Sequence, residues 1–151
     1  MVFNGAKKGD EKSSASPDRR KVLGAKPRDR RVQVVRVLLE GSFQQKLGLR
    51  DMSAKVNLSR WRLAHLFKAE TGMSPQRYLT LVRLQRARDQ LANSFLSVQE
   101  IGAAVGIPNP SQFTKNFKAA YGMTPVEYRR TRFETLTFGQ RPSPTGESSD
   151  D

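Results

Sequence analysis

The ten residues LFKAETGMSP, from Leu66 to Pro75, return in altered form fifty positions later as NFKAAYGMTP, from Asn116 to Pro125. In each copy a glycine can end one helix, because glycine tolerates the left-handed backbone of a helix C-cap. The hydroxyl residue and proline that follow suit the N-cap and the first turn of the next helix. The sequence therefore predicts that one helix stops and another starts in the same way at two places.

The repeat extends upstream of these segments into a short helix and a tight turn. Three apolar positions match when one residue is added to the second turn, between Ile107 and Pro110: they are Ala54, Val56 and Leu58 in the first unit and Ala103, Val105 and Ile107 in the second. An insertion costs least in a turn. Each unit then consists of a short helix, a turn and a second helix, which is the helix-turn-helix layout.

The fold class is predicted to be all-α, because apolar residues recur at helical spacing and no stretch alternates as a strand does. Ser97 with Glu100 and Thr124 with Glu127 have the spacing of a capping box at a helix start. We expect seven helices, with two helix-turn-helix subdomains joined by a central linker helix. Their predicted ranges are 30–40, 49–56, 59–71, 75–93, 98–105, 110–121 and 125–134.

The two ends of the chain differ in composition from the middle. Residues 1–29 are rich in Gly, Ser, Lys, Arg and Pro, and from about Gly139 to Asp151 the chain repeats Pro, Ser and Thr and finishes on two aspartates. Such segments bury too little apolar surface to offset the entropy of ordering. We expect a disordered basic arm over 1–29, a folded domain over 30–135 with its helix-turn-helix units at about 49–71 and 98–121, and a disordered tail over 136–151.

A formal net charge of +13 favours a polyanionic partner, although charge alone does not separate DNA from RNA or anionic lipid. The chain has no cysteine and a single histidine, His65, which excludes thiolate zinc sites and histidine clusters. Carboxylates are scattered, and no glycine-rich phosphate loop or triad spacing is present. We therefore expect neither enzyme activity nor a cofactor. No stretch has the character of a signal peptide or a membrane span, so a cytoplasmic protein without membrane contact is expected.

The second helix of each unit has an inward and an outward face. Leu63, Phe67, Phe113 and Phe117 fall on the inward stripe and are predicted to be core residues. The outward positions are Trp61, Ala64, His65 and Lys68 in the first unit and Ser111, Thr114, Lys115 and Lys118 in the second. Polar groups there suit base edges, and the Trp61 indole suits thymine methyls, whereas Lys68 and Lys118 lie further along, where a phosphate contact fits better.

Each of these assignments has an alternative that the sequence leaves open. The lysines could simply be solvated, Trp61 could be buried in the core, and His65 could be a surface spacer. The basic arm could neutralise phosphates or only keep the protein in solution.

Several runs resemble the signature of AraC/XylS-type transcription regulators. These runs are RLQRARDQL at 83–91, IGAAVGI at 101–107, FTKNFK at 113–118 and GMTPVEYR at 122–129, and the first unit, 58–67, fits as well. The resemblance covers about 30–135. It implies a monomeric DNA-binding domain whose two recognition helices enter successive major grooves, and transcriptional control, usually activation, with RNA polymerase as a candidate partner.

By position, the resemblance makes Trp61, His65, Ser111, Gln112, Thr114 and Lys115 contacts to bases and backbone. The full set of candidate DNA-binding residues is Arg60, Trp61, Arg62, Ala64, His65, Lys68, Ser111, Gln112, Thr114, Lys115 and Lys118. Two departures stand out: Ile107 replaces an aromatic residue, and Gln112 to Lys115 replace a Tyr-Phe-Ser-Arg pattern. Lysine lacks the planar fork of arginine, so base preference at Lys115 is expected to be weaker.

Most relatives carry a sensing or dimerising domain before this one, and none is evident here. The chain is therefore expected to be a single-domain regulator or a truncated DNA-binding fragment of a larger one. Two rival functions remain, a nonspecific nucleic-acid-binding protein and an interaction module that has lost DNA contact. The nonspecific protein would need stacking aromatics on a shared surface.

Overall fold

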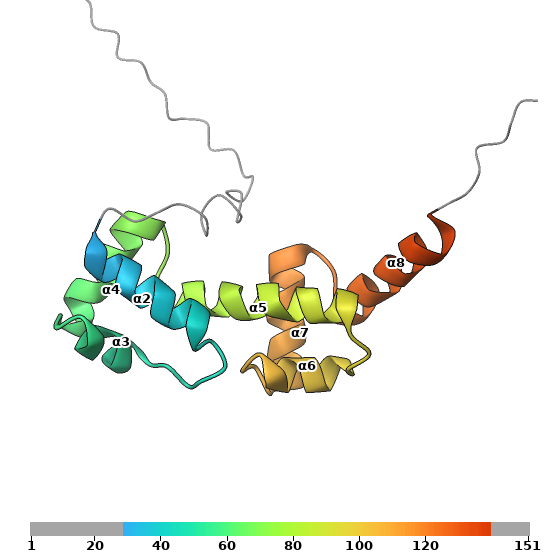
Figure 1. Cartoon of the computed structure of the whole chain (residues 1–151), viewed down its shortest axis with the longest axis horizontal. Coiled ribbons are helices and arrows are strands. Elements are labelled where there is room, and N and C mark those ends of the chain that lie inside the picture. The colour runs from blue at the N-terminus through green and yellow to red at the C-terminus, as the bar shows by residue number, and fades with distance from the viewer. Residues whose placement is uncertain (1–28, 140–151) are drawn as a thin grey trace, which may run out of the picture.

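The structure, a computed structural model, describes residues 29–139, and in this range it contains seven α-helices and no strand (Figure 1). The helices are α2 (Arg30–Gly41), α3 (Leu49–Lys55), α4 (Arg60–Thr71), α5 (Pro75–Asn93), α6 (Val98–Ala104), α7 (Pro110–Tyr121) and α8 (Pro125–Phe138). The predicted all-α class and the order of the elements are confirmed. The proposed arm, apart from its last residue, and residues 140–151 of the proposed tail lie outside the described range.

The bounds of the helices follow the capping signals in the sequence. Five helices begin at a residue whose side chain accepts a hydrogen bond from a backbone N–H three residues later: Ser59, Ser74, Ser97, Asn109 and Thr124. In both predicted capping boxes the glutamate, Glu100 or Glu127, accepts the backbone N–H of the cap residue at 2.7 Å. These hydrogen bonds to the charged form lower the pKa of both glutamates.

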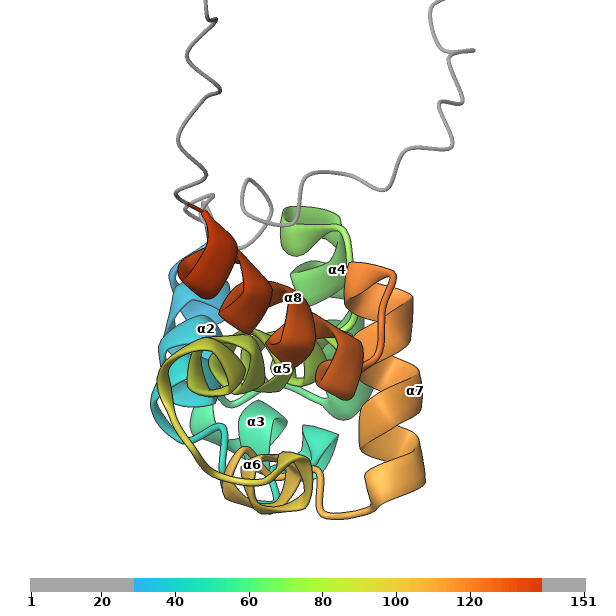
Figure 2. The same ribbon diagram turned by 90° about the vertical axis from the view of Figure 1, so that its right-hand side faces the viewer.

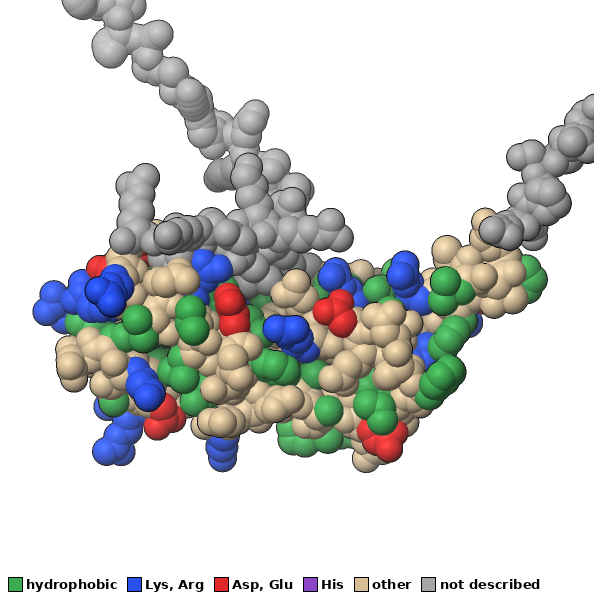
Figure 3. Space-filling model, viewed as in Figure 1, with side chains coloured by type: hydrophobic (Ala, Val, Ile, Leu, Met, Phe, Trp, Pro, Cys, Tyr) green, Lys and Arg blue, Asp and Glu red, His purple; other side chains and the backbone are tan. Residues whose placement is uncertain are grey.

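Helix α8 is longer than predicted. It continues to Phe138, whereas the expected end was residue 134, so residues 136–138 of the proposed tail are helical. Its last turns are exposed, and Phe133, Leu136 and Phe138 present 41%, 72% and 63% of their surface. The hydrophobic side chains along this end of the molecule are visible in Figure 3. Because its last turns are exposed and form no buried apolar stripe, the sequence pattern gave little indication that the helix would continue.

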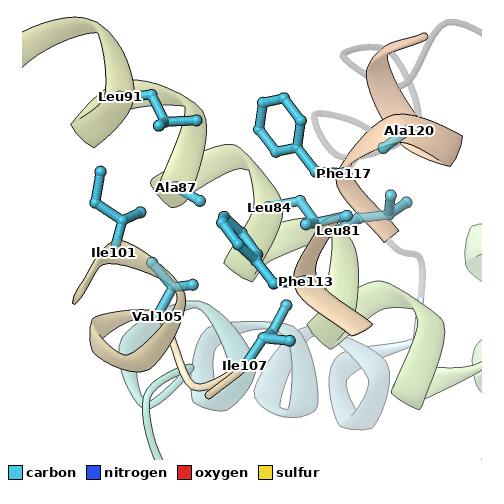
Figure 4. Packing of buried hydrophobic residues seen from close by; sticks show 10 residues of the cluster. All are labelled: Leu81, Leu84, Ala87, Leu91, Ile101, Val105, Ile107, Phe113, Phe117 and Ala120. Carbon is cyan, nitrogen blue, oxygen red and sulfur yellow. The ribbon is translucent and has the colours of Figure 1, made fainter. Parts of the chain in front are cut away.

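Two hydrophobic cores share α5. The first core consists of Val32, Val35, Leu39, Met52, Leu63, Phe67, Tyr78, Leu79 and Val82. The second, drawn in Figure 4, consists of Leu81, Leu84, Ala87, Leu91, Ile101, Val105, Ile107, Phe113, Phe117 and Ala120. The four predicted core residues of α4 and α7 are thus confirmed, and both cores draw on the same central helix.

The two cores use different sides of α5. At about 100° per residue, Tyr78 and Val82 lie on one side of the helix and Ala87 and Leu91 lie on roughly the opposite side. Figure 2 looks along α5 and shows α2 on one side of it and α7 on the other. The helix is therefore buried on two faces, and the angle between these faces fixes how the two halves of the domain are rotated relative to each other.

The junction between the halves is held by Arg83 of α5. Its Nε donates to the carbonyl of Phe43 and its Nη2 donates to the carbonyl of Gln45, both at 2.7 Å. Burial lowers the pKa of this guanidinium. Phe43 and Met73 pack against both cores. The segment between α2 and α3 is thereby tied to the middle of α5.

The first core contains a buried polar cluster that joins α2 to α5. Arg36 Nε donates to the Tyr78 hydroxyl at 2.9 Å, and this hydroxyl donates to Glu40 Oε1 at 2.5 Å. The Tyr78 ring meets the Phe67 ring edge-on, with centroids 5.5 Å apart. Burial, and then the hydrogen bond to Glu40, raise the pKa of Tyr78 to about 12.

Replacing Tyr78 by Phe is expected to lower the free energy of unfolding by about 1 to 3 kcal/mol, because buried Arg36 loses one hydrogen-bond acceptor. The raised pKa also predicts that the wild type loses stability as the pH rises from about 10 to about 12, since only the folded state keeps the tyrosine proton there. Urea unfolding at neutral and alkaline pH measures both effects. Equal stability of the two proteins at pH 7 would show that the cluster contributes nothing.

Gly102 allows α6 to approach α7 closely. A Cβ at this position would lie 2.9 Å from the Ile107 carbonyl oxygen and 3.2 Å from Phe113 Cδ1. The Gly102 carbonyl also accepts the backbone N–H of Ile107 at 2.8 Å, which closes the turn. There is therefore no room for a side chain at the place where the recognition helix of the second unit docks.

Replacing Gly102 by Ala is expected to cost about 1 to 3 kcal/mol of stability, because Phe113 and the turn have to move. The matched control is Gly41→Ala at the end of α2, where a Cβ would meet nothing within 4 Å. Thermal unfolding should show a lower Tm for Gly102→Ala and an unchanged or higher Tm for the control. Equal Tm values would contradict the close approach.

Candidate nucleic-acid interface

The two helix-turn-helix units have the same turn. Asn57 (φ 52°) and Gly106 (φ 91°) are the residues with positive φ between the first and second helix of their units. In both cases the next residue, Leu58 or Ile107, points into or against a core. The repeat register predicted from sequence is confirmed, and the added residue of the second turn is Pro108, because the N-caps Ser59 and Asn109 correspond.

The second helix of each unit docks through aromatic side chains. Phe67 of α4 and Phe117 of α7 have no exposed surface. Phe67 packs on Tyr78 and Phe117 packs on Tyr128, with ring centroids 5.5 and 5.7 Å apart. The same contact thus recurs at both positions of the repeat, and it turns the opposite face of α4 and of α7 outward.

The predicted contact residues lie on these outward faces. Exposed members are Arg60, Trp61, Arg62, His65 and Lys68 on α4 and Ser111, Gln112, Lys115 and Lys118 on α7. Ala64 and Thr114, which occupy the same position in the two units, are half-buried at the edge of this face. Trp61 is 68% exposed, so burial in the core, the alternative raised from the sequence, is wrong for this residue.

Three side-chain contacts organise the outward faces. On α4 the Trp61 and His65 rings stack with centroids 4.0 Å apart and planes tilted by 32°. His65 Nδ1 lies 2.9 Å from the Trp61 carbonyl oxygen. On α7 the Gln112 Nε2 donates to Asn116 Oδ1 at 2.8 Å. These contacts hold the Trp61, His65 and Gln112 side chains along their helices before any ligand binds.

The two units differ in charge. The first, from α3 to α4, carries the cations Arg50, Lys55, Arg60, Arg62 and Lys68, whereas the second, from α6 to α7, carries Lys115 and Lys118. Arg50 and Lys55 are exposed on α3 and were not among the predicted residues. The sequence gave one indication of a role for these two residues, which is that they are cations within a predicted helix-turn-helix unit. When Asp51 and Glu70 in the first unit and Glu100 in the second are counted against these cations, the first unit still has the larger positive charge, so it attracts an anionic ligand more strongly.

Two other features, a metal site and a membrane span, are absent from the described part of the chain. Between residues 29 and 139 no three His, Asp or Glu side chains are arranged to hold a metal ion. Within the same range no helix is both long and apolar enough to cross a membrane.

Comparison with known proteins identifies the domain. Residues 52–131 match the family model described as a helix-turn-helix domain. The Msm operon regulatory protein of Streptococcus mutans is 32% identical over 99 residues, which are 66% of this chain and 36% of that protein. The chain spans about a third of the length of the curated relatives it matches.

Solved structures with the same arrangement of helices are similar in sequence as well. The C-terminal domain of AraT, a response regulator from Geobacillus stearothermophilus, has a TM-score of 0.65 and 28% identity and covers 80% of this chain and 94% of its own. A transcriptional regulator with an AraC-type DNA-binding domain from Chromobacterium violaceum has a TM-score of 0.64 and 28% identity and covers 76% and 96%.

The family match covers more than half of the chain and runs from α3 into α8. It agrees with the two helix-turn-helix units and the shared helix α5 described above. It also places the chain among DNA-binding regulators rather than enzymes. The chain belongs to the AraC/XylS family of helix-turn-helix transcription regulators and carries their DNA-binding domain.

Proposed function

We propose that the chain binds duplex DNA sequence-specifically as a monomer, with α4 and α7 in two adjacent major grooves. The observation that carries this proposal is that α4 and α7, which carry the two outward faces, both pack on one helix, α5. At 1.5 Å per residue this helix is about 28 Å long. That length suits the ~34 Å between successive major grooves on one side of B-DNA, and a modest bend of the DNA would make up the difference.

The residues of each face divide into two roles. Trp61, His65 and Lys115 lie in the first half of α4 or α7, where a recognition helix meets base edges. Lys68 and Lys118 lie about one turn further along, where a lysine meets phosphate oxygens and supplies affinity without sequence information. Arg60, Arg62, Ser111, Gln112, Ala64 and Thr114 complete the proposed interface.

A nonspecific single-strand binder is less well supported. Such a protein would gather exposed aromatic rings along one groove. The large aromatics that are exposed in the described part of the chain are Trp61, Phe95, Phe133 and Phe138, and they belong to α4, the α5–α6 loop and α8. They do not form a common stacking platform on the recognition helices.

The proposal extends to the rest of the protein. We place it in the cytoplasm as a transcription regulator, an activator that contacts RNA polymerase, in keeping with the operon-regulator names of its relatives. The cations within residues 1–29 add general affinity by neutralising phosphates. The net charge of +13 supports this role.

Selection from a library of random duplexes tests the function directly. We expect enrichment of a two-part motif whose halves are separated by about one helical turn, ~10 base pairs. A fluorescent duplex carrying this motif should bind much more tightly than a scrambled duplex at the same salt concentration. Equal binding to both would contradict sequence-specific recognition.

Substitutions on the outward faces should weaken specific binding and leave the fold intact. Trp61→Ala and Lys115→Ala are each expected to cost about 1 to 3 kcal/mol of binding to the selected site, because base contacts are lost. Lys118→Ala is the matched control on α7 and should weaken binding to selected and scrambled duplexes alike. Normal binding by Trp61→Ala and Lys115→Ala, with circular dichroism unchanged, would mean that these faces do not meet the bases.

A further inference from the structure

His65 and Lys115 occupy the same position in the two units. Each lies in the second turn of its recognition helix, counted from the N-caps Ser59 and Asn109, and both side chains are exposed. The position therefore meets the same part of the groove in both halves of a bound duplex. The two side chains differ in hydrogen-bonding chemistry, and the structure shows how.

The geometry of His65 fixes which ring nitrogen carries the proton. Nδ1 lies 2.9 Å from the Trp61 carbonyl oxygen, and a carbonyl oxygen only accepts hydrogen bonds. Nδ1 must therefore be the donor in this contact. In the neutral imidazole the other nitrogen, Nε2, then bears a lone pair and is an acceptor.

Trp61 holds this arrangement in place. Its indole ring stacks on the imidazole at a centroid distance of 4.0 Å, and its own carbonyl receives the Nδ1 hydrogen bond. Two contacts to one residue restrict rotation of the His65 side chain. The Nε2 atom at the far edge of the exposed ring is consequently presented as an acceptor before DNA binds.

Lys115 presents the opposite chemistry. An ammonium group has three donors and no acceptor. In the major groove the acceptors are N7 and O6 of guanine, N7 of adenine and O4 of thymine, whereas the donors are the amino groups of adenine and cytosine. A side chain that donates and one that accepts are matched by different base atoms.

We propose that the two units read opposite hydrogen-bonding groups at this shared position: His65 accepts from the amino group of an adenine or cytosine, and Lys115 donates to a purine N7 or guanine O6. This inference rests on the proposed function, because it assigns base atoms to a face that must first enter the groove. It makes the binding site chemically unsymmetrical although the protein is a repeat, so the selected motif has a direction.

The tautomer can be tested without DNA. His65 is the single histidine of the chain, so the ring signals need no assignment to a residue, and the pattern of couplings to the ring protons distinguishes Nδ1 from Nε2. Long-range proton–nitrogen NMR of the neutral ring should show a protonated Nδ1 and an unprotonated Nε2. Trp61→Ala removes the ring contact but keeps the main-chain carbonyl of residue 61, so the preference for a protonated Nδ1 should weaken without disappearing. A protonated Nε2 in the wild type would overturn the inference.

Atomic substitutions in the selected duplex test the contacts themselves. The base pair that His65 contacts is identified as the position of the selected motif at which base preference is lost in His65→Ala. There, replacing adenine by purine, or cytosine by pyrimidin-2-one, removes the amino group and should weaken wild-type binding about fivefold, the size of one lost hydrogen bond. The same change should leave His65→Ala unaffected, which controls for the weaker base pair.

The base pair under Lys115 should respond in the opposite way. A 7-deaza purine, or 2-aminopurine in place of guanine, should weaken wild-type binding about fivefold there, while the 7-deaza change under His65 has no effect. Lys68→Ala is the control that weakens every duplex equally. The inference would be overturned if binding depended on a purine N7 or guanine O6 at the base pair that His65 contacts, or if His65→Ala kept the base preference of the wild type. If the wild type does not distinguish the selected duplex from a random one, the proposed function itself fails.

Discussion

The central physical constraint in this domain is that one helix is buried in two hydrophobic cores. Tyr78, Leu79 and Val82 complete the first core and Leu84, Ala87 and Leu91 complete the second. Since the backbone of a helix is stiff over this length, neither core can rotate relative to the other without losing burial of α5. Arg83, by binding the carbonyls of Phe43 and Gln45, adds a polar tie at the point where the halves meet.

This constraint fixes how the outward faces of α4 and α7 are placed relative to each other. A helix-turn-helix unit alone offers a short face, whereas two units at a fixed separation and rotation present a pattern that only one length and phase of duplex fits. The units are similar in backbone, down to the positive φ of Asn57 and Gly106, and different in surface chemistry. The first is richer in cations and carries the stacked Trp61 and His65, so under the proposed function the protein would bind DNA in one direction.

Most of the fold could be predicted from the sequence because the helix ends depend on local interactions between neighbouring residues. Gly72 and Gly122, the hydroxyl N-caps and the prolines act on neighbouring backbone groups and need no tertiary information. The roles of individual residues in α5 could not be predicted in the same way. Apolar residues occur on more than one face of α5, so their spacing does not show to which core Leu81 or Val82 belongs. The structure shows that Leu81 lies in the second core and its neighbour Val82 in the first.

In the candidate site, too, some features could be predicted from the sequence and others could not. The outward position of Trp61, His65 and Lys115 follows from the helical stripe that Phe67 and Phe117 define. The contact of His65 with its own helix, and the half-burial of Ala64 and Thr114, depend on rotamers and neighbouring turns and were not predictable. The extension of α8 to Phe138 was missed because the segment lacks a buried stripe, although Gly139 follows its last residue.

The most direct measurement of the central claim is the affinity of the protein for selected duplexes in which the spacing between the two half-sites is changed. Inserting about five base pairs, half a helical turn, rotates one half-site to the other side of the duplex. If α5 is the rigid connection described here, affinity should fall to that of one half-site, and adding a full turn should not restore it because the helix cannot lengthen. Undiminished affinity for either duplex would show that the two units move independently.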